Sequence, residues 1–258
     1  MPVGTMELLA IAEDAARRAG ALLLERFERP ATGIEYKSTP TDLVSDADRD
    51  AEKLLINSIS SKRPDDGFLA EEGGGGASST GMRWVIDPLD GTVNFLFGLP
   101  AWCVSVAVED SAGALAAVVY DPNRDDLYSA VRGGGARLNG APASVSDTKD
   151  LATALVGTGF AYDARMRAEQ ADIVSRVLPL VRDIRRLGSA ALDLCLVSCG
   201  RLDAYYEAVM GPWDRAAGAL IAREAGATVT DLMPPFGDEV GVVAANPVLH
   251  DRLRELVG

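Results

Sequence analysis

The hydrophobic pattern of this chain changes its period twice, and the order of these changes restricts the architectures that it can adopt. Between Met6 and Arg29, apolar residues recur every three or four positions, which predicts a long amphipathic helix. A second helix is expected over Ala47–Ser60, with Ser45 as its N-cap and Asp48 as the capping-box partner. The chain therefore begins with two helices that each have one apolar face.

Short segments rich in β-branched and aromatic residues follow these helices: Arg83–Ile86, Trp102–Val108, Leu115–Tyr120 and Leu127–Val131. Turns that contain Asp and Gly, or Pro and Asn, separate the segments, which predicts a mostly antiparallel sheet. The glycine runs at 73–76 and 133–135 lack the spacing of nucleotide-binding loops, so we interpret them as flexible turns.

The second half of the chain alternates between helices and strands. Helices are predicted over 165–181, 189–198 and 213–225, and strands over 204–207 and near 228 and 240. Asn246 and Pro247 form a good N-cap and first-residue pair for a last helix. Helices, then antiparallel strands, then alternating elements predict a layered α+β or α/β fold. No linker divides it, so we expect a single domain over 1–258, with an N-terminal part over 1–145 and a C-terminal part over 146–258.

The charge balance disfavours several classes of partner. With 38 acidic and 25 basic residues, the chain carries a net charge of -13, which repels nucleic acid and anionic membranes. No apolar run of about 18 residues occurs, and residues 1–5 lack the features of a signal peptide. We therefore expect a soluble, cytoplasmic protein that binds neither nucleic acid nor membranes.

The cysteines and the single histidine do not form a recognisable site. Cys103, Cys195 and Cys199 are odd in number and lack the spacing of a zinc site, which indicates reduced core thiols. His250 is expected on a surface helix with a solvated side chain. Mechanisms that require a histidine base are therefore disfavoured.

Acidic residues instead gather in five short segments: Asp42–Asp48, Glu71–Gly73, Asp87–Thr92, Glu207 and Trp213–Asp214. Taken singly, each has an ordinary structural explanation, such as a helix-start acid, a solvated turn or an N-cap. The Asp87 segment is different, because it directly follows the apolar residues Trp84–Ile86, which places Asp87 at the end of a buried strand. An unpaired carboxylate at such a position is costly.

The turn after this strand has the composition of a cation site. Pro88 is expected to end the strand pairing, and Gly91 with Thr92 permits a tight turn. Asp87 and Asp90 lie three residues apart across that turn and can point toward one centre. Carboxylates and the backbone carbonyls of a turn are the ligands that hard divalent cations prefer. The amides of Gly91 and Thr92, at a helix start, can bind an anion beside the cation.

Several segments together resemble the inositol monophosphatase family. Two of them, WVIDPLDGTVNF at Trp84–Phe95 and PWDRAAGALIAREAGA at Pro212–Ala227, are similar to the specific signatures of that family. The likeness extends to Lys37–Asp48, to Glu71–Gly73 and to Arg185–Glu207, and so covers nearly the whole chain. The resemblance implies a five-layered α-β-α-β-α sandwich, usually a homodimer, and a lithium-sensitive phosphatase with two or three Mg2+ ions.

The resemblance also implies a set of metal ligands. Glu71, Asp87 and the Leu89 carbonyl would bind a first ion, and Glu71 would reach a third ion through water. Asp87, Asp90 and Asp214 would bind the second ion.

Further roles follow from the same resemblance. Asp48 and Thr92 would orient the attacking water, and Lys37 and Glu72 would support the metal ligands from behind. Contacts to the substrate are implied for Asp90, Gly91, Thr92, Ala190 and Glu207, where the Gly91 and Thr92 amides hold the phosphate and Glu207 and the Ala190 backbone hold the hydroxyls. One departure concerns Gly211, at a position that is often histidine in animal members and that helps to line the leaving-group pocket.

The resemblance implies hydrolysis of inositol monophosphate, and the residues favour direct attack of a metal-activated water, with Asp48 accepting the proton through Thr92. The first alternative keeps this chemistry but acts on fructose 1,6-bisphosphate, histidinol phosphate or a 3'-phosphonucleotide. The second alternative is a regulatory interaction protein that retains the fold without turnover.

Overall fold

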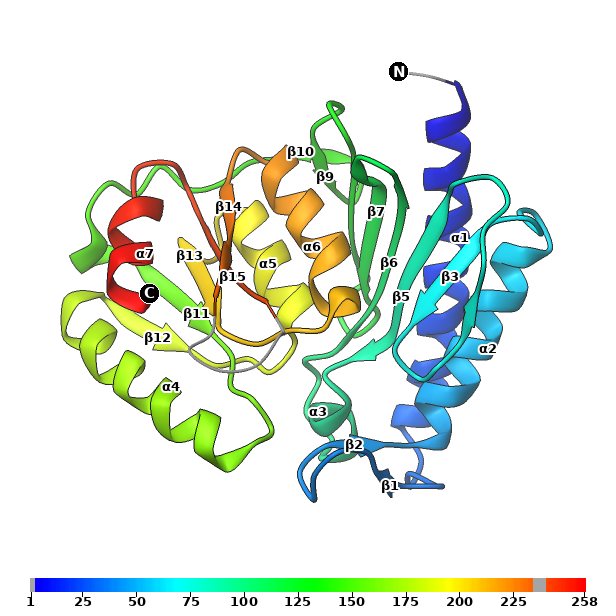
Figure 1. Ribbon diagram of the computed structural model, residues 1–258, viewed down its shortest axis with the longest axis horizontal. Helices are drawn as coiled ribbons and strands as arrows, with labels where there is room; N and C mark the ends of the chain where they lie inside the picture. The colour runs from blue at the N-terminus through cyan, green and yellow to red at the C-terminus, as the bar shows by residue number, and fades with distance from the viewer. Residues whose placement is uncertain (1–2, 234–239) are drawn as a thin grey trace.

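The computed structural model describes residues 3–233 and 240–258, and over these residues the chain forms five layers in which two sheets alternate with helices (Figure 1). The helices are α1 (Val3–Phe27), α2 (Asp46–Ser60), α3 (Thr92–Leu96), α4 (Ala164–Val177), α5 (Ala190–Ser198), α6 (Pro212–Glu224) and α7 (His250–Val257). Helices α1 and α2 form one outer layer, α5 and α6 the central layer, and α4 and α7 the other outer layer (Figure 1). The predicted five-layered sandwich is confirmed.

The larger sheet lies between α1/α2 and α5/α6. Its strands are, in spatial order, β10 (Ala141–Ala143), β9 (Ala136–Leu138), β8 (Asp126–Val131), β7 (Gly113–Asp121), β6 (Cys103–Asp110), β5 (Arg83–Asp90), β3 (Gly67–Ala70) and β4 (Gly75–Gly76). Neighbouring strands in this sheet are antiparallel except β3 and β5, which run parallel. The mostly antiparallel sheet expected from the sequence is therefore confirmed, although β3, β4, β9 and β10 were not predicted.

The smaller sheet separates α5/α6 from α4/α7. Its spatial order is β12 (Asp183–Arg185), β11 (Leu155–Thr158), β13 (Ala204–Glu207), β15 (Gly241–Ala245) and β14 (Thr228–Leu232). A separate hairpin of β1 (Glu35–Tyr36) and β2 (Leu43–Val44) precedes α2. The alternation of helices and strands that the sequence predicted for the second half is confirmed. Together with β11 and β12, which were not predicted, these elements build this sheet and the helices on both of its faces (Figure 1).

A hydrophobic core fills each space between adjacent layers. Successive residues of a strand point to opposite faces of its sheet, so one strand supplies two cores. On β5, Trp84 packs toward α1 and α2 while Val85 packs toward α5 and α6. On β13, Tyr205 and Tyr206 divide in the same way between the α5 side and the α4/α7 side. Burying each such large side chain stabilises the fold by roughly 1.5–3 kcal/mol.

Local sequence signals place the start of α2 correctly. The Ser45 hydroxyl accepts a hydrogen bond from the Ala47 amide at 3.2 Å, and the Asp48 carboxylate accepts one from the Ser45 amide at 2.9 Å. This reciprocal capping box satisfies backbone donors that the first helical turn leaves unpaired. The predicted cap is confirmed, and the helix begins at Asp46, one residue earlier than expected.

The expected end of pairing at Pro88 is wrong. Strand β5 pairs with β6 up to Asp87 opposite Ser105, and pairing resumes at Asp90 opposite Cys103 after a shift in register. A proline removes one donor without preventing the chain from rejoining the ladder at a bulge. The bulge therefore places Asp87 and Asp90 at the end of one continuous strand.

The last helix and its histidine also differ from expectation. The Asn246 side chain accepts hydrogen bonds from the amides of Val248 and Leu249, which closes a separate turn, so α7 begins at His250 and not at Pro247. His250 is 1% exposed, and its Nε2 lies 2.9 Å from the Thr230 hydroxyl on β14. The prediction of a solvated histidine is therefore wrong, because the sequence pattern did not reveal that β14 packs beside this helix.

Candidate active site

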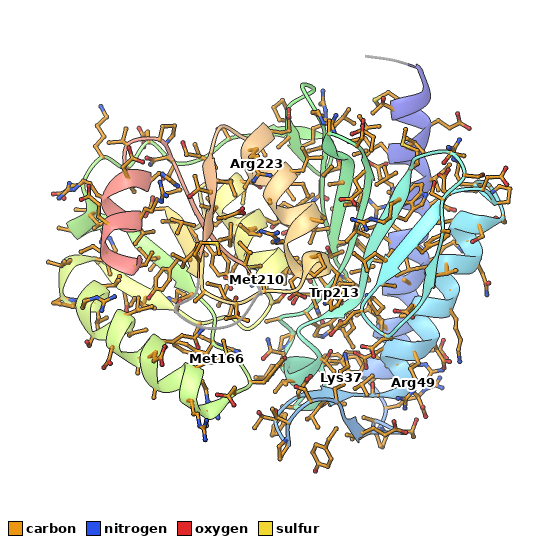
Figure 2. The ribbon with its side chains drawn as sticks, in the orientation of Figure 1. Lys37, Arg49, Met166, Met210, Trp213 and Arg223 are labelled. Atoms are coloured by element: carbon orange, nitrogen blue, oxygen red, sulfur yellow. The ribbon has the colours of Figure 1, made fainter. Side chains whose placement is uncertain are left out.

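The acidic segments meet at a cavity of about 370 Å³ that is lined from both halves of the chain. Figure 2 labels four of its lining residues, Lys37, Met166, Met210 and Trp213. At its floor, Asp87, Asp90 and Asp214 each offer one carboxylate oxygen, and these oxygens lie within 4.8 Å of one another. Residues from the end of β5 and from the first turn of α6 are thus brought together.

Asp87 is held by the turn that follows it. Its Oδ1 accepts a hydrogen bond from the Leu89 amide at 2.9 Å, and the residue is 1% exposed. Burial raises the pKa of Asp87 well above its usual value, and the neighbouring charges of Glu71, Asp90 and Asp214 raise it further. The following turn therefore fixes the Asp87 side chain, while burial and the neighbouring carboxylates disfavour its ionised form.

Asp90 has more favourable partners. Its Oδ2 accepts hydrogen bonds from the Ser189 hydroxyl at 2.6 Å and from the Ala191 amide, in the first turn of α5, at 2.7 Å. Burial raises the pKa of Asp90 to about 6 even though these hydrogen bonds oppose the rise. Ser189 directly precedes α5 but does not cap its own helix, because its hydroxyl is used for Asp90.

Asp214 enters the site from the first turn of α6. Its Oδ2 accepts a hydrogen bond from the Gly211 amide at 2.8 Å. Burial raises the pKa of Asp214 well above its usual value, and the charges of Asp90 and Glu71 add to the effect. Three clustered carboxyls with raised pKa values fit a hard divalent cation, because such a cation supplies the charge compensation that the protein does not.

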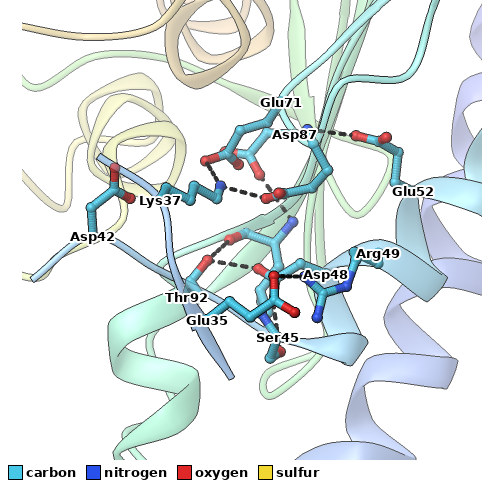
Figure 3. A network of polar contacts seen from close by, with 12 residues as sticks. Glu35, Lys37, Asp42, Ser45, Asp48, Arg49, Glu52, Glu71, Asp87 and Thr92 are labelled. Carbon is cyan, nitrogen blue, oxygen red and sulfur yellow. Dashed lines mark hydrogen bonds and ion pairs between the residues drawn. The ribbon is translucent and has the colours of Figure 1, made fainter. Parts of the chain in front are cut away.

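Glu71 lies next to this group and belongs to an ion-pair network (Figure 3). The Lys37 ammonium contacts Glu71 Oε1 at 2.8 Å and Glu72 Oε1 at 2.5 Å. Burial alone would lower the pKa of Lys37, but the two carboxylates together raise it above its usual value. Burial raises the pKa of Glu72 to about 7, against the hydrogen bond from Lys37. In this arrangement Lys37 holds Glu71 at the edge of the three-carboxyl group.

Glu52 is a member of this network that sequence reasoning missed. Its two carboxylate oxygens accept hydrogen bonds from the amides of Glu72 at 2.8 Å and Gly74 at 3.0 Å, and the side chain is buried (Figure 3). It therefore anchors the turn that carries Glu71. A signal was present, because Glu52 follows Asp48 by four residues and so lies on the same face of α2.

Thr92 and Asp48 form a buried hydroxyl and carboxylate pair (Figure 3). The Thr92 Oγ1 lies 2.8 Å from Asp48 Oδ1 and 3.0 Å from the Leu89 carbonyl oxygen. Asp48 Oδ2 accepts hydrogen bonds from the amide and the hydroxyl of Ser45, at 2.9 and 2.6 Å. The cap of α2 thus aims one carboxylate oxygen at Thr92, and no solvent reaches Asp48.

The remaining predicted contacts also line the cavity. Ala190 begins α5, and Gly91 precedes α3 with a φ of 99°, a left-handed conformation that suits glycine. Glu207, at the end of β13, accepts a hydrogen bond from the Tyr205 hydroxyl. Burial raises the pKa of Glu207 to about 7, against the effect of that hydrogen bond. Of the sequence-predicted site residues, Asp48 and Glu72 do not line this cavity, and the others do.

Comparison with known proteins agrees with this geometry. A sequence model described as the inositol monophosphatase family matches residues 5–258. An "Inositol-1-monophosphatase SuhB" of Mycobacterium tuberculosis strain H37Rv is 44% identical over 265 residues, covering 95% of this chain and 91% of the relative. The chain belongs to the inositol monophosphatase family.

Two further relatives carry names other than inositol-1-monophosphatase. The crystal structure of the "extragenic suppressor protein suhB" from Bartonella henselae has a TM-score of 0.90, at 35% identity and with 98% of each chain covered. A "Nus factor SuhB" of Escherichia coli K12 is 40% identical over 244 residues, covering 93% of this chain and 91% of the relative. Membership of the inositol monophosphatase family and these structural neighbours support a phosphatase.

Gly211, the departure noted in the sequence, has a structural reason in this member of the inositol monophosphatase family. A Cβ atom added at Gly211 would lie 2.7 Å from Cε2 of the Trp213 ring. Any side chain here would therefore displace Trp213, which lines the cavity, or the N-cap that holds Asp214.

Across the described residues, none of the helices combines the length and apolar composition needed to cross a membrane.

Proposed function

We propose that this protein is a Mg2+-dependent phosphatase that hydrolyses a small phosphate monoester, with inositol monophosphate as the favoured substrate. The observation that carries the proposal is that the Asp87, Asp90 and Asp214 carboxyls lie in one cavity with Thr92, whose hydroxyl donates a hydrogen bond to the buried Asp48. The three carboxyls suit divalent cations, and the hydroxyl with its acceptor suits the activation of a water.

The metal ligands proposed are Glu71, Asp87 and the Leu89 carbonyl for one Mg2+, and Asp87, Asp90 and Asp214 for another, with Glu71 reaching a third through water. When bound, such ions lower the pKa of a ligand water and stabilise charge on the phosphoryl and leaving oxygens. Raised carboxyl pKa values support this assignment, because they reflect negative charge that has no compensation in the protein itself.

The protein's own groups would move the proton. With Thr92 donating to Asp48 Oδ1 at 2.8 Å, a lone pair of Thr92 Oγ1 can accept a hydrogen bond from the attacking water. The water oxygen forms the new bond to phosphorus, the bond from phosphorus to the alcohol oxygen breaks, and the water proton passes through Thr92 to Asp48. The departing alkoxide takes a proton from solvent and leaves as the alcohol. No covalent intermediate is needed.

The phosphate and the alcohol would be held by different walls. The Gly91 and Thr92 amides, at the start of α3, are proposed to bind phosphate oxygens. Glu207 and the Ala190 backbone are proposed to bind hydroxyls of the alcohol, because a carboxylate can accept two hydrogen bonds from adjacent hydroxyls. The position of Glu207 on the lining of this cavity, where its side chain is only partly exposed, favours such a role over that of an ordinary surface acid.

Other features of the proposal come from the family. A homodimer, a cytoplasmic location and inhibition by lithium are expected on this ground. Fructose 1,6-bisphosphate, histidinol phosphate or a 3'-phosphonucleotide would use the same metal and phosphate groups and differ only at the alcohol wall.

A second candidate function is a regulatory interaction, which the name "Nus factor SuhB" of the 40% identical relative suggests. The cluster of buried carboxyls disfavours a protein that has only this role, because a scaffold has no physical need for uncompensated buried charges.

A panel of phosphate esters tests the proposal. We expect purified protein with Mg2+ to hydrolyse inositol 1-phosphate with a higher kcat/KM than fructose 1,6-bisphosphate, histidinol phosphate or 3'-phosphoadenosine 5'-phosphate. Excess chelator should abolish activity. Turnover that persists in chelator would contradict the metal assignment, and a preference for another ester would contradict the substrate assignment. Absence of turnover on every ester would favour the interaction role.

A further inference from the structure

A buried acid in the cavity has no role in the mechanism described so far. Asp193, in the first turn of α5, is 1% exposed and lines the cavity beside Glu207. Over residues 3–233 and 240–258, its carboxyl makes no hydrogen bond, and its Oδ1 is fully buried without a partner. Leaving a buried carboxyl without a partner costs stability, so the fold alone gives no reason for an acid here.

Two glycines, one on β11 and one just after it, lie beside these two acids, and Gly159 makes room for Glu207. Gly157 and Gly159 are two residues apart, so they face the same side of the chain where it is extended. A Cβ atom at Gly157 would lie 3.5 Å from Asp193 Oδ1, in ordinary contact, and 3.0 Å from Cδ2 of Tyr205. A Cβ atom at Gly159 would overlap the Glu207 carboxylate. The two carboxyls therefore lie over the same glycine-lined wall.

The two acids differ in how the protein satisfies them. Glu207 accepts a hydrogen bond from Tyr205, whereas Asp193 has no such partner among the described residues. Burial raises the pKa of Asp193 well above its usual value, the charge of Glu207 raises it further, and Arg186 opposes the rise. A carboxylate can accept a charge-assisted hydrogen bond from an alcohol hydroxyl, and this bond is stronger than the one that a neutral amide oxygen accepts.

We propose that Asp193 is a specificity-determining residue that hydrogen-bonds a hydroxyl of the substrate alcohol at the floor of the cavity, beside the hydroxyls that Glu207 contacts. This inference rests on the proposed function, because it requires an alcohol with several hydroxyls. The ligand class is a polyol phosphate. A phosphate ester of a simple phenol has no hydroxyl for Asp193 to bind.

The test compares two substrates across two variants of Asp193. Asp193→Asn keeps the shape of the side chain, and Asp193→Ser removes most of it. The ratio of kcat/KM for inositol 1-phosphate to kcat/KM for p-nitrophenyl phosphate is expected to fall about tenfold in Asp193→Asn, and further in Asp193→Ser. Asp121→Asn is the matched control, because Asp121 is also a buried acid but lies outside the cavity, and this ratio should stay at the wild-type value.

Thermal unfolding of the same proteins separates a ligand contact from a structural role. Because Asp193 lacks a partner in the described part of the chain, Asp193→Asn should leave the melting temperature of the substrate-free protein unchanged or higher. A clear fall in the melting temperature of both Asp193 variants, with both substrates affected equally, would overturn the proposal and make the acid structural.

A double variant separates direct contact from positioning through Glu207. If Asp193 contacts its own hydroxyl, Asp193→Asn should lower the substrate ratio again when it is added to Glu207→Gln. If it adds nothing to Glu207→Gln, Asp193 acts only through Glu207 and direct contact is refuted.

Failure of the proposed function has a different signature. A wild-type enzyme that does not prefer inositol 1-phosphate over p-nitrophenyl phosphate would refute the polyol assignment itself. A wild-type enzyme with that preference, together with an Asp193→Asn ratio within about twofold of wild type, would refute only the role of Asp193.

Discussion

Replacing Asp90 by asparagine is expected to abolish catalysis while it stabilises the cation-free protein. Burial raises the pKa of Asp90 from 3.8 to about 6, even though Ser189 and the Ala191 amide donate hydrogen bonds to it. At about 1.4 kcal/mol per pH unit, ionised Asp90 costs the cation-free fold about 3 kcal/mol. An asparagine keeps the shape and removes the charge, so up to this amount of stability should be gained at pH 7.

The pH dependence gives this prediction its sign. Because the folded pKa of Asp90 lies above its unfolded value, the cost is absent below about pH 3.8, grows as the pH rises, and is complete above about pH 6. The advantage of Asp90→Asn should therefore be large at pH 7 and small near pH 4. In Mg2+ the wild type should be more stable than Asp90→Asn, because the wild type gains a free energy of cation binding that the variant has lost.

Urea unfolding in excess chelator and in Mg2+, at pH 4.5 and pH 7, measures these changes. Asp66→Asn is a control of opposite sign: burial alone would raise the pKa of Asp66, but hydrogen bonds from Arg63, Thr80 and Trp84 lower it. That variant should lose stability at pH 7 with or without Mg2+. The reasoning is refuted if Asp90→Asn is less stable than wild type in chelator at pH 7, or if it keeps full activity.

Four other outcomes follow from the same site. Glu207→Gln should lower kcat/KM for inositol 1-phosphate, which corresponds to a rise of about 1.5 to 3 kcal/mol in activation free energy, and should lower kcat/KM for p-nitrophenyl phosphate far less. Equal losses on both substrates would show that Glu207 does not contact the alcohol. Mg2+ should raise the melting temperature of the wild type, since a cation offsets repulsion among Asp87, Asp90 and Asp214; an unchanged melting temperature by scanning calorimetry would argue against cation binding there. Ca2+ should inhibit the Mg2+ enzyme, because it tolerates looser geometry than in-line attack requires, and steady-state assays with Li+ should show inhibition; insensitivity to Li+ would count against inositol-type behaviour.

Local signals in the sequence predicted many elements within a few residues. The capping box of Ser45 and Asp48 locates α2, because its hydrogen bonds join residues only three apart. The strand over 204–207 is reproduced as β13, since short β-rich segments between turns have few alternatives. Predictions failed where neighbours distant in sequence decide, as at His250, which is buried because β14 packs beside it.

The five-layered fold and the metal-ligand set were inferred from the resemblance of whole motifs, whereas the residues alone indicated a layered fold and a cation site at Asp87 and Asp90. That Asp214 joins these two residues depends on α6 packing against β5 of the larger sheet, at a sequence separation that no local pattern spans.

The amino-acid sequence alone determined which residues are acidic, at which strand or helix ends they lie, and which turns orient their side chains. These features depend on backbone geometry over only a few residues. Only the tertiary structure decided which acids share one cavity and which have partners. In the sequence, Glu52 and Asp193 are both acids in a helix. In the described chain, however, Glu52 accepts hydrogen bonds from two backbone amides, and Asp193 accepts none. The difference arises because a buried carboxyl is satisfied by whatever distant segment the fold places against it, and that placement is set by the packing of all five layers.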